Sequence, residues 1–449
     1  MDRTLACLAA WMPQQRWYAA KGARPALRLV SWWDLPVGDT VARTYLVADE
    51  GSSPAITYQV PTILRPAEQA DPGAVIGHPE PGVALLDAPR DPAFAAALLR
   101  LITAGGRATG SGLAAVGHPA LPAPPVGSAH TAAVLSGEQS NTSIVYRPAG
   151  EGIPIIAKLF RQVHAGLNPD VELTSALAAA GSPFVARAIG AIEGEWTDAL
   201  SHRPAGGSLA FAQEFLPGVE DAWRVALRAA AADDDFSARA RALGGATARV
   251  HAGLADLFPT RAVADADREA TVDGWRRRLA AAIDDVPALA AHVPAIEAVY
   301  AAAAAAPWPA LQRVHGDYHL GQVILVPGRG WVLLDFEGEP MRPMSDRLRP
   351  DLAARDVAGM LRSFDYVTGA LLQDEQHPPV ALLREWTDRA RAAFLAGYRD
   401  AAVTTAADTL LSALELDKAV YETSYEARNR PAWVPIPLGA VARLAGGRS

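Results

Sequence analysis

Three side chains that suit phosphoryl transfer lie within one short segment, residues 313–340. Asp317 ends a His-Gly-Asp triplet, Gln322 follows five residues later, and Asp335 comes directly after the apolar run 331–334. Transfer of a phosphoryl group needs a carboxylate that orients the acceptor hydroxyl and takes its proton, and an amide and a second carboxylate that hold magnesium ions. We therefore predict that Asp317 is the catalytic base and that Gln322 and Asp335 bind Mg²⁺, a hard cation that prefers oxygen ligands.

The order of these residues resembles that of known kinases. In protein kinases an Asn stands five residues after the catalytic Asp, and a DFG motif follows. Here Gln322 takes the place of that Asn, and Asp335-Phe336-Glu337 takes the place of DFG. The loop resembles the HGDxHxxN or HGDxHxxQ loop of the aminoglycoside phosphotransferase branch of the kinase-like fold.

A zinc site is the weaker alternative for the same segment. His315 and His319 stand four residues apart, as zinc-binding histidines on a helix do. However, Gly316 disfavours a helix, and the Glu of an HExxH motif is missing. An isolated HGD triplet is also common by chance, so the kinase-like interpretation depends on the whole pattern of loop, apolar strand and Asp-Phe.

The composition limits the class of protein. The 449 residues suffice for two or three domains of about 100–200 residues each, and the 50% apolar content can fill sizeable cores. A net charge of −8 without a Lys/Arg-dense face argues against a nucleic-acid partner. Cys7 is the only cysteine, which excludes an internal disulfide and suits the cytoplasm. No run approaches the roughly 18 apolar residues of a membrane span, so no membrane partner is expected.

Residues 1–97 are predicted to form a small cap subdomain. An amphipathic helix opens it, and short strand-like runs separated by Gly-, Asp- and Pro-rich turns follow, which favours a β meander with one flanking helix. Four tryptophans fall here and are expected in the core rather than on a ligand platform: Trp11, Trp17, Trp32 and Trp33.

Residues 98–215 are predicted to form an intermediate, kinase-like N-lobe. A helix opens the segment, and the Gly/Pro-rich stretch 108–128 is interpreted as a loop or linker. Lys158 lies on a later strand, and Glu172 lies in a helix capped by Asn168. Each charge alone is typical of an ordinary surface. Their order before the catalytic segment predicts the Lys–Glu pair that holds the α- and β-phosphates of a nucleotide.

The turn expected to cover the phosphates, residues 137–143, lacks a GxGxxG motif. Backbone N–H groups and polar side chains would have to cradle the phosphates instead, and the candidates are Ser140, Asn141, Thr142 and Ser143. The N-lobe is expected to end in a hinge at 213–215, where Gln213 and Phe215 would contact adenine. Residues 216–449 are predicted to be a mostly helical C-lobe.

Several longer segments resemble one family across nearly the whole chain. They are QRWYA at 15–19, GEQSNTS at 137–143, GLNPDVEL at 166–173, RVHGDYHLGQV at 313–323, LLDFEGEP at 333–340, RDVAGMLRSFDY at 355–366, ELDKAVYETSYEARNRP at 415–431 and WVPIPL at 433–438. Together they resemble the actinobacterial maltokinases. The resemblance implies an α+β, bilobal, protein-kinase-like (aminoglycoside phosphotransferase-like) fold with an extra N-terminal cap subdomain.

The resemblance also implies an activity. Such enzymes use ATP and Mg²⁺ to phosphorylate the anomeric hydroxyl of maltose, and the maltose 1-phosphate feeds α-glucan synthesis from trehalose, with trehalose synthase as a functional partner. Lys418, Tyr421 and Tyr425 would contact the sugar. Their i, i+3 and i+7 spacing supports this independently, because it places them on one helix face. His319, close to Asp317 in sequence, is a further candidate for substrate contact.

Three alternatives remain open at this point. The acceptor could be another small molecule such as glucosamine or an aminoglycoside. The chain could be a non-catalytic binding or regulatory pseudokinase, although retention of Asp317, Gln322 and Asp335 argues against this. The helix face that carries Lys418 could simply pack on the lobe.

Overall fold

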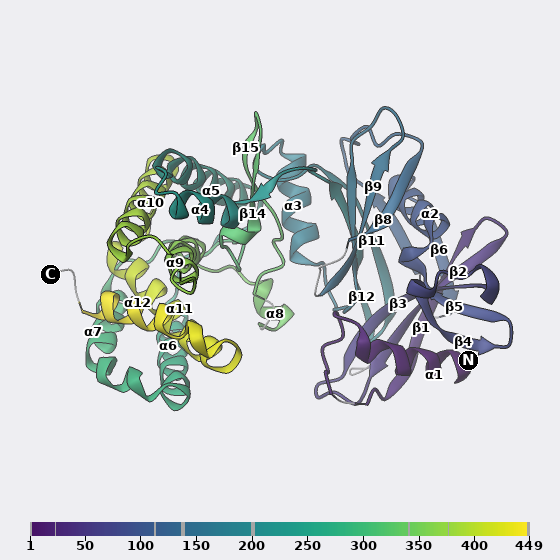
Figure 1. Ribbon diagram of the computed structural model, residues 1–449, viewed down its shortest axis with the longest axis horizontal. Helices are drawn as coiled ribbons and strands as arrows, with labels where there is room; N and C mark the ends of the chain where they lie inside the picture. Colours follow the sequence, from purple (N-terminus) through teal and green to yellow (C-terminus); the bar gives the residue numbers. More distant parts are fainter. Residues whose placement is uncertain are drawn as a thin grey trace. The chain divides into compact units, whose positions relative to one another are not determined.

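The chain folds into two compact units. The computed structural model describes residues 2–22, 24–111, 114–135, 140–198, 203–339, 342–375 and 377–446. Unit 1 comprises Met1–Gly181 and Ala186–Pro217, and unit 2 comprises Ser182–Val185 and Gly218–Ser449. Each unit is described here by itself, and Figure 1 colours both along the sequence.

Unit 1 is built on one antiparallel sheet of twelve strands in the order β4-β5-β3-β2-β1-β6-β7-β11-β12-β10-β9-β8 (Figure 1). The strands are β1 (Leu27–Val37), β2 (Thr40–Asp49), β3 (Ile56–Pro66), β4 (Val75–Glu80), β5 (Val83–Asp87), β6 (Arg107–Ser111), β7 (Ala114–Pro119), β8 (His130–Val134), β9 (Asn141–Pro148), β10 (Ile155–Phe160), β11 (Ala188–Thr197) and β12 (Pro204–Glu214). Three α-helices accompany the sheet: α1 (Asp2–Trp11), α2 (Pro92–Thr103) and α3 (Pro169–Ala179).

The predicted β meander with a flanking helix is confirmed. Strands β1, β2 and β3 pair antiparallel in sequence order, and α1 lies beside them. Every second residue at the end of β1 is buried, which is the two-residue period of a strand with one face in a core. Trp33 and Trp17 are buried. Trp11 and Trp32 are partly buried and pack against the apolar cluster that contains Trp17, so the tryptophans belong to the core as expected.

One prediction about this part of the chain is wrong. The stretch 108–128, interpreted as a loop, contains most of β6 and all of β7. Gly110 and Gly117 serve close approach rather than turning, because a Cβ on either would lie within 2 Å of a backbone oxygen. The expected boundary at 97–98 falls inside α2, and the sheet continues without interruption from the cap strands to the N-lobe strands.

The strand and helix that carry the nucleotide candidates form where predicted. Lys158 lies in β10, and the side chain of Asn168 caps α3 by accepting a hydrogen bond from the amide of Asp170. Pro169 occupies the first helical position, where its missing N–H costs nothing.

Unit 2 is mostly helical, as predicted. Its α-helices are α4 (Ala222–Ala231), α5 (Ser237–Leu257), α6 (Asp265–Asp285), α7 (Val293–Ala305), α8 (Met344–Arg347), α9 (Ala354–Leu371), α10 (Val380–Ala401), α11 (Asp408–Asn429) and α12 (Pro435–Ala445). A small antiparallel sheet contains β13 (Glu220–Asp221), β14 (Val323–Val326) and β15 (Gly330–Leu333). The predicted apolar strand before Asp335 is therefore β15. Helix α9 packs on α11, and α5 on α10.

One apolar stretch departs from the sequence expectation. Residues 287–305 are long and apolar enough to cross a membrane by length and composition. In the structure they form a short 3-10 helix, Pro287–His292, followed by α7, and Leu289, Ile296 and Tyr300 lie in the same core cluster as residues of α6 and α11. Only 22% of this stretch is buried, so it contributes a few side chains to the core.

Candidate functional site

The backbone before Asp317 is held by a buried carboxylate. Asp356, at the start of α9, accepts hydrogen bonds from the amides of His315 at 2.8 Å and Gly316 at 2.9 Å. His251 of α5 contacts the same carboxylate at 3.0 Å. Burial opposes ionisation of Asp356, yet the hydrogen bond and charge of His251, together with the Gly316 amide, hold its pKa below the usual value. Sequence analysis missed Asp356, because its partners lie about forty residues away in the chain.

Gly316 has a φ of +86°, a conformation that side chains rarely adopt. A Cβ at this position would also lie 3.2 Å from the Cα of Gly338. The loop turns sharply here because Gly316 allows it, and Asp356 fixes the turn.

His315 joins the loop to the segment that carries Asp335. Its Nδ1 accepts from the Asp317 amide at 3.4 Å, and its Nε2 lies 2.9 Å from the carbonyl oxygen of Leu334. A ring that accepts at Nδ1 donates at Nε2, so both contacts are satisfied by one neutral tautomer. The ring also packs on Phe336, with centroids 4.7 Å apart.

The predicted metal ligands lie side by side. The amide nitrogen of Gln322 donates to Oδ2 of Asp335 at 3.1 Å, so the polar ends of the two side chains lie together. Glu337 has a carboxylate oxygen within 4.8 Å of one of Asp335, an addition that sequence analysis did not make. Asp335 has a φ of +65°, a strained conformation of the kind found at functional sites. These oxygen donors fit Mg²⁺.

Helix α11 brings the predicted sugar residues beside Asp317. The ammonium nitrogen of Lys418 lies 4.0 Å from Oδ1 of Asp317 and 5.6 Å from the ring centroid of Tyr421. Tyr421 and Tyr425 stack, with centroids 6.4 Å apart and planes inclined by 26°. Tyr425 is 43% exposed, so its ring is open to solvent. The structure thus gathers the three α11 residues and the predicted base at one place in unit 2.

Two further polar groups surround this place. Burial lowers the pKa of His319, whose neighbours include the carboxylates of Asp317 and Asp335. Its Nδ1 accepts from the Gly321 amide and so caps the 3-10 turn Leu320–Gln322, which is a structural task in addition to the predicted substrate contact. Burial raises the pKa of the Tyr421 phenol, and the neighbouring Glu339 carboxylate acts in the same direction.

Arg347 is a cation that sequence analysis missed. It lies on the short helix α8, within a segment that had no periodic signal. Burial lowers the pKa of its guanidinium, and the carboxylates of Glu337, Asp317 and Glu339 act in the opposite direction. A guanidinium near these acidic groups is a natural partner for phosphate oxygens.

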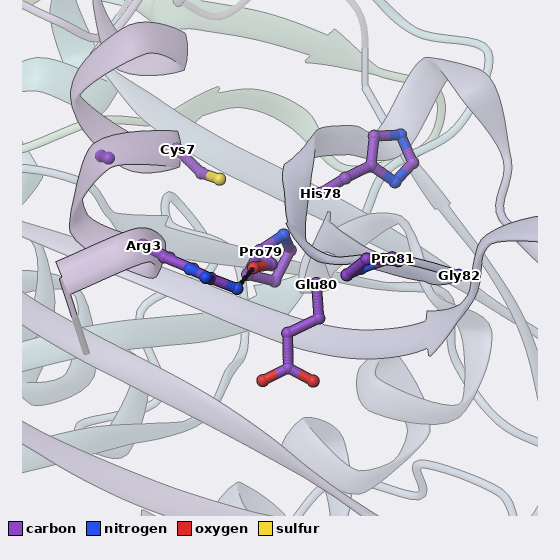
Figure 2. Close-up of a pocket in the computed structure, with 8 residues that line it drawn as sticks. Arg3, Cys7, His78, Pro79, Glu80, Pro81 and Gly82 are labelled. Atoms are coloured by element: carbon purple, nitrogen blue, oxygen red, sulfur yellow. Dashed lines mark hydrogen bonds between the residues drawn. The ribbon is translucent and has the colours of Figure 1, made fainter.

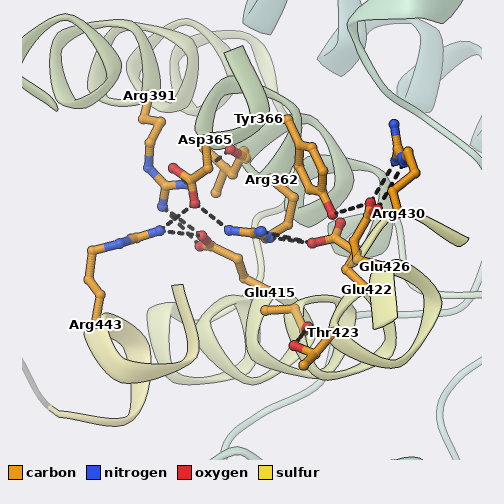
Figure 3. A network of polar contacts seen from close by, with 12 residues as sticks. Arg362, Asp365, Tyr366, Arg391, Glu415, Glu422, Thr423, Glu426, Arg430 and Arg443 are labelled. Atoms are coloured by element: carbon orange, nitrogen blue, oxygen red, sulfur yellow. Dashed lines mark hydrogen bonds and ion pairs between the residues drawn. The ribbon is translucent and has the colours of Figure 1, made fainter. Parts of the chain in front are cut away.

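A network of ion pairs anchors α11 along the face next to the one that carries Lys418, Tyr421 and Tyr425 (Figure 3). Arg362 of α9 donates to Glu422 at 2.8 Å, and Arg391 of α10 pairs with Glu415 at 2.8 Å. Burial disfavours the charge of Arg362, but the carboxylates around it hold its pKa above the ordinary value. Further contacts join Asp365, Tyr366, Glu426, Arg430 and Arg443. The network holds α11 against its neighbouring helices, so Lys418 and the two tyrosines project from a helix that is fixed in place.

The nucleotide pair in unit 1 differs from the prediction by two residues. Lys158 donates to Asp170 at 2.8 Å, and Asp170 is fully buried at the start of α3. Residues two apart on a helix point to different sides, so Asp170 rather than Glu172 faces β10 as the described partner. The sequence predicted the position of the helix correctly, but not which of its residues faces Lys158.

The predicted phosphate-covering residues divide between the two sheet faces. Ser143 lies directly opposite Lys158 in the β9–β10 register, so both side chains share one face. Thr142 is one residue earlier, on the other face, and its hydroxyl accepts from Arg161 at 2.7 Å. Ser140 is exposed, Asn141 begins β9, and residues 137–139 lie outside the described part of the chain.

The predicted hinge residues lie at the end of β12. Gln213 is buried and pairs with both β10 and β11. The amide of Phe215 donates to the Pro154 carbonyl at 2.8 Å. An adenine contact at Phe215 would therefore use its carbonyl or its ring, not its N–H.

A separate hollow lies on the cap between α1 and β4 (Figure 2). Its lining residues are Arg3, Ala6, Cys7, His78, Pro79, Glu80, Pro81 and Gly82. Arg3 crosses it to reach the Pro79 carbonyl at 3.5 Å. It contains none of the predicted site residues.

The chain has a carboxylate on an HGD loop, an amide after that loop, a second carboxylate after an apolar strand, and a lysine paired with a helix residue. Together these groups define the class of the protein, a kinase-type phosphotransferase. The comparisons with known proteins agree. The family model of the phosphotransferase enzyme family matches residues 131–408, well over half of the chain, and the model of the maltokinase N-terminal cap domain matches residues 11–91. The chain belongs to the phosphotransferase enzyme family and is a maltokinase-like kinase with an N-terminal cap and the aminoglycoside phosphotransferase-like fold.

Similar proteins carry the name glucosamine kinase. One from Streptacidiphilus jiangxiensis is 35% identical over 246 residues, which are 51% of this chain and 56% of that protein. Another from Mycolicibacterium smegmatis is 31% identical over 253 residues, 51% of this chain and 61% of that protein. The match therefore spans less than two thirds of either relative.

Solved structures extend the likeness over the whole chain. Crystal form B of a glucosamine kinase has a TM-score of 0.72 at 25% identity and covers 98% of this chain and 99% of that one. A glucosamine kinase in complex with glucosamine, ADP and inorganic phosphate has a TM-score of 0.69 at 24% identity, with 98% of each chain covered. The second likeness shows the fold alone.

Proposed function

We propose that the chain is an ATP-dependent kinase that phosphorylates the anomeric hydroxyl of maltose, yielding maltose 1-phosphate and ADP. The match of residues 11–91 to the maltokinase cap domain supports this acceptor. The observation that carries the proposal is the position of Lys418, whose ammonium lies 4.0 Å from a carboxylate oxygen of Asp317. A residue of α11 thereby stands beside the proposed base.

Asp317 and the residues of α11 have different roles toward the acceptor. The Asp317 carboxylate accepts the proton of the reacting hydroxyl as that oxygen attacks the γ-phosphate. Lys418 donates to a neighbouring sugar hydroxyl and fixes which hydroxyl faces Asp317. The rings of Tyr421 and Tyr425 offer two adjacent aromatic faces, enough for two pyranose rings, and aromatic faces pack well on the apolar side of a sugar. His319 contributes a further polar contact near the base.

The remaining charged groups would bind the phosphates. Gln322 and Asp335, with Glu337 close by, would hold Mg²⁺, which would supply positive charge against that of the phosphates. Arg347 supplies a protein cation beside the same acidic residues. In unit 1, Lys158, positioned by Asp170, contacts the nucleotide phosphates, the backbone at 140–143 covers them, and Gln213 and Phe215 lie at the adenine end.

The cellular setting follows from the same proposal. Maltose 1-phosphate is an activated maltosyl donor, suited to α-glucan synthesis, and an enzyme that supplies maltose, such as a trehalose synthase, would be a functional partner of this kinase. The single cysteine agrees with a cytoplasmic location.

Phosphorylation of glucosamine is the second candidate. It is favoured by the names of the relatives that match 51% of this chain. An amino sugar carries an ammonium near neutral pH, and Lys418 places a like charge next to Asp317, where such an acceptor would have to bind. This arrangement favours a neutral sugar.

The deciding experiment measures ADP release by the full-length chain with a panel of acceptors: maltose, maltotriose, trehalose, glucose, glucosamine and an aminoglycoside. We expect kcat/KM to be highest for maltose, and the product to lose its reducing end, which marks phosphorylation at the anomeric carbon. A highest kcat/KM for glucosamine would assign the chain to the second candidate.

A further inference from the structure

A basic groove runs along helices α5 and α10 of unit 2. The two helices pack side by side (Figure 1), and the groove that they border has a volume of about 870 Å³. Its charged lining residues are four arginines and one carboxylate: Arg239, Arg241, Arg249 and Arg329, and Asp400. The groove is therefore positively charged, although the net charge of the chain is −8.

The floor of the basic groove is open because small residues form it. A Cβ on Gly397 of α10 would lie 1.9 Å from the carbonyl oxygen of Arg241, so the absence of a side chain is what lets the two helices approach here. On α5, the lining residues Ala238, Ala242 and Gly245 are spaced four and three residues apart and so share one helix face. Because these side chains are small, this face leaves room for another segment of polypeptide.

The arginines on α5 differ in how far their charge is neutralised. Arg241 is paired with Asp400, and both side chains are more than half exposed. Arg249 lies over the ring of Phe184, with 5.7 Å between its central carbon and the ring centroid. Arg239 and Arg249 are exposed, and within the described part of the chain no carboxylate pairs with either. Two guanidinium groups of the groove are thus available to an anionic partner.

The spread of these two arginines distinguishes a small anion from a longer one. Arg239 and Arg249 are ten residues apart on α5, which is about 15 Å along a helix that rises about 1.5 Å per residue. A single phosphate group is much smaller than this distance, so it cannot contact both guanidinium groups. A segment that carries several carboxylates can contact both.

We propose that the basic groove is a docking surface for an acidic segment of a partner protein. Carboxylates of such a segment would pair with Arg239 and Arg249, because a guanidinium binds a carboxylate through two parallel hydrogen bonds. Complementary charges of this kind speed association and select the partner. A long polyanion such as a nucleic acid fits less well, because the exposed acidic run Asp233–Asp235 lies directly before α5 and would repel it. This surface is separate from the groups proposed to transfer the phosphate.

A peptide of glutamate and alanine tests the proposal on the full-length chain. A labelled peptide of about twelve residues would span about 18 Å as a helix, enough to reach both arginines. Fluorescence anisotropy should show saturable binding at low salt that weakens as salt is added, because exposed charge pairs are screened. A peptide with glutamine in place of each glutamate should not bind. Absence of saturable binding by the glutamate peptide, or equal binding by the glutamine peptide, would overturn the proposal.

Charge reversal locates the binding site of the peptide. Arg239→Glu/Arg249→Glu should raise the Kd about 10-fold or more, since each change replaces attraction by repulsion. Arg277→Glu/Arg384→Glu is the matched control, because it changes the net charge equally at exposed arginines of α6 and α10 outside the groove. The control should leave the Kd within about 2-fold. Equal losses in the two variants would mean that the peptide responds to net charge alone, and would refute a docking surface.

Ala242→Leu tests the floor of the groove without a change of charge. The larger side chain should raise the Kd of the peptide about 3-fold or more by occupying the floor, with the melting temperature unchanged. Unaltered affinity would contradict docking on this face. Tighter binding of a single-stranded oligonucleotide or of polyphosphate of equal charge would assign the groove to another class of polyanion and reject the proposal. A dimer in sedimentation that Arg239→Glu/Arg249→Glu dissociates would also reject it, in favour of a second copy of this chain.

Discussion

The catalytic segment 313–339 and helix α11 meet at Asp317, but they are held in different ways. The segment is fixed by short-range hydrogen bonds to backbone amides, with Asp356 and His315 at the centre. Helix α11 is fixed by side-chain ion pairs to four other helices, α6, α9, α10 and α12, and its functional face remains partly open. The catalytic segment carries the groups proposed to act on the phosphates, which are the same for every acceptor. Helix α11 carries the groups proposed to select the acceptor.

The difference has an energetic side. Hydrogen bonds from backbone amides to a buried carboxylate leave the loop little conformational freedom. Each amide left without its partner would cost about 1–3 kcal/mol of folding free energy. A buried ion pair is rigid only while all its members are present, and removal of one partner costs about 3–5 kcal/mol. The α11 face can therefore change residue by residue while its support stays in place, which suits a surface that distinguishes acceptors.

Removal of the divalent cation should have the largest effect. Gln322 and Asp335 offer only oxygen donors, so EDTA should reduce turnover to background, and added Mg²⁺ or Mn²⁺ should restore it. The measurement is ADP release with a saturating acceptor, before and after dialysis against chelator. Turnover that persists in EDTA would remove the metal from this site.

Asp317→Asn should come next. The amide keeps the shape and cannot take a proton, so kcat should fall about 10²- to 10⁴-fold, as for general bases, while ADP binding stays intact. Calorimetric titration with ADP supplies the folded control. A variant with a near-normal rate would mean that Asp317 is not the base.

Lys418→Ala should act on the acceptor alone. Loss of one charged hydrogen bond to a sugar hydroxyl should lower kcat/KM for maltose about 10-fold or more, with the KM for ATP almost unchanged. Arg399→Ala, which removes an exposed cation of α10 paired with Asp408, is the control and should leave both constants alone. An equal loss for ATP and maltose would show that Lys418 supports the fold of the site rather than the sugar.

Tyr425→Ala should have the smallest effect. The ring is 43% exposed and contributes stacking area only, so the KM for maltose should rise about 2- to 10-fold, and that for glucose less, because a second sugar ring has more face to stack. Tyr421→Ala, closer to Lys418, should match or exceed it. If both variants phosphorylate maltose normally, this face of α11 is structural.

The same contrast explains what the sequence could predict. Asp317, Gln322 and Asp335 are close in the chain, and their chemistry restricts their spacing, so their mutual arrangement was predictable. Lys418 was placed by resemblance and helix periodicity, and the structure brings it to Asp317. Asp356 was missed because its partners are distant in sequence, and Arg347 was missed because its segment has no periodic signal.

Errors in unit 1 have equally physical causes. Glu172 was preferred to Asp170 because a helix's rotation about its axis is set by packing against β10, which no local pattern contains. Strands β6 and β7 were read as a loop because glycine marks both turns and places where two backbones approach closely. The role of Thr142 changed because only the β9–β10 register shows which face a side chain occupies.

The unbroken sheet of unit 1 has a consequence for synthesis on the ribosome. Gln59 of the cap bonds to Phe160 and Leu209, which are 101 and 150 residues further along the chain. The cap is made first, yet these bonds cannot form until β10 and β12 have emerged. Pairing between such distant segments is slow, and unpaired strand edges stay exposed during the delay. The nascent N-terminal strands are thus the part of this protein most in need of chaperone protection, although they contain none of the groups proposed to transfer the phosphate.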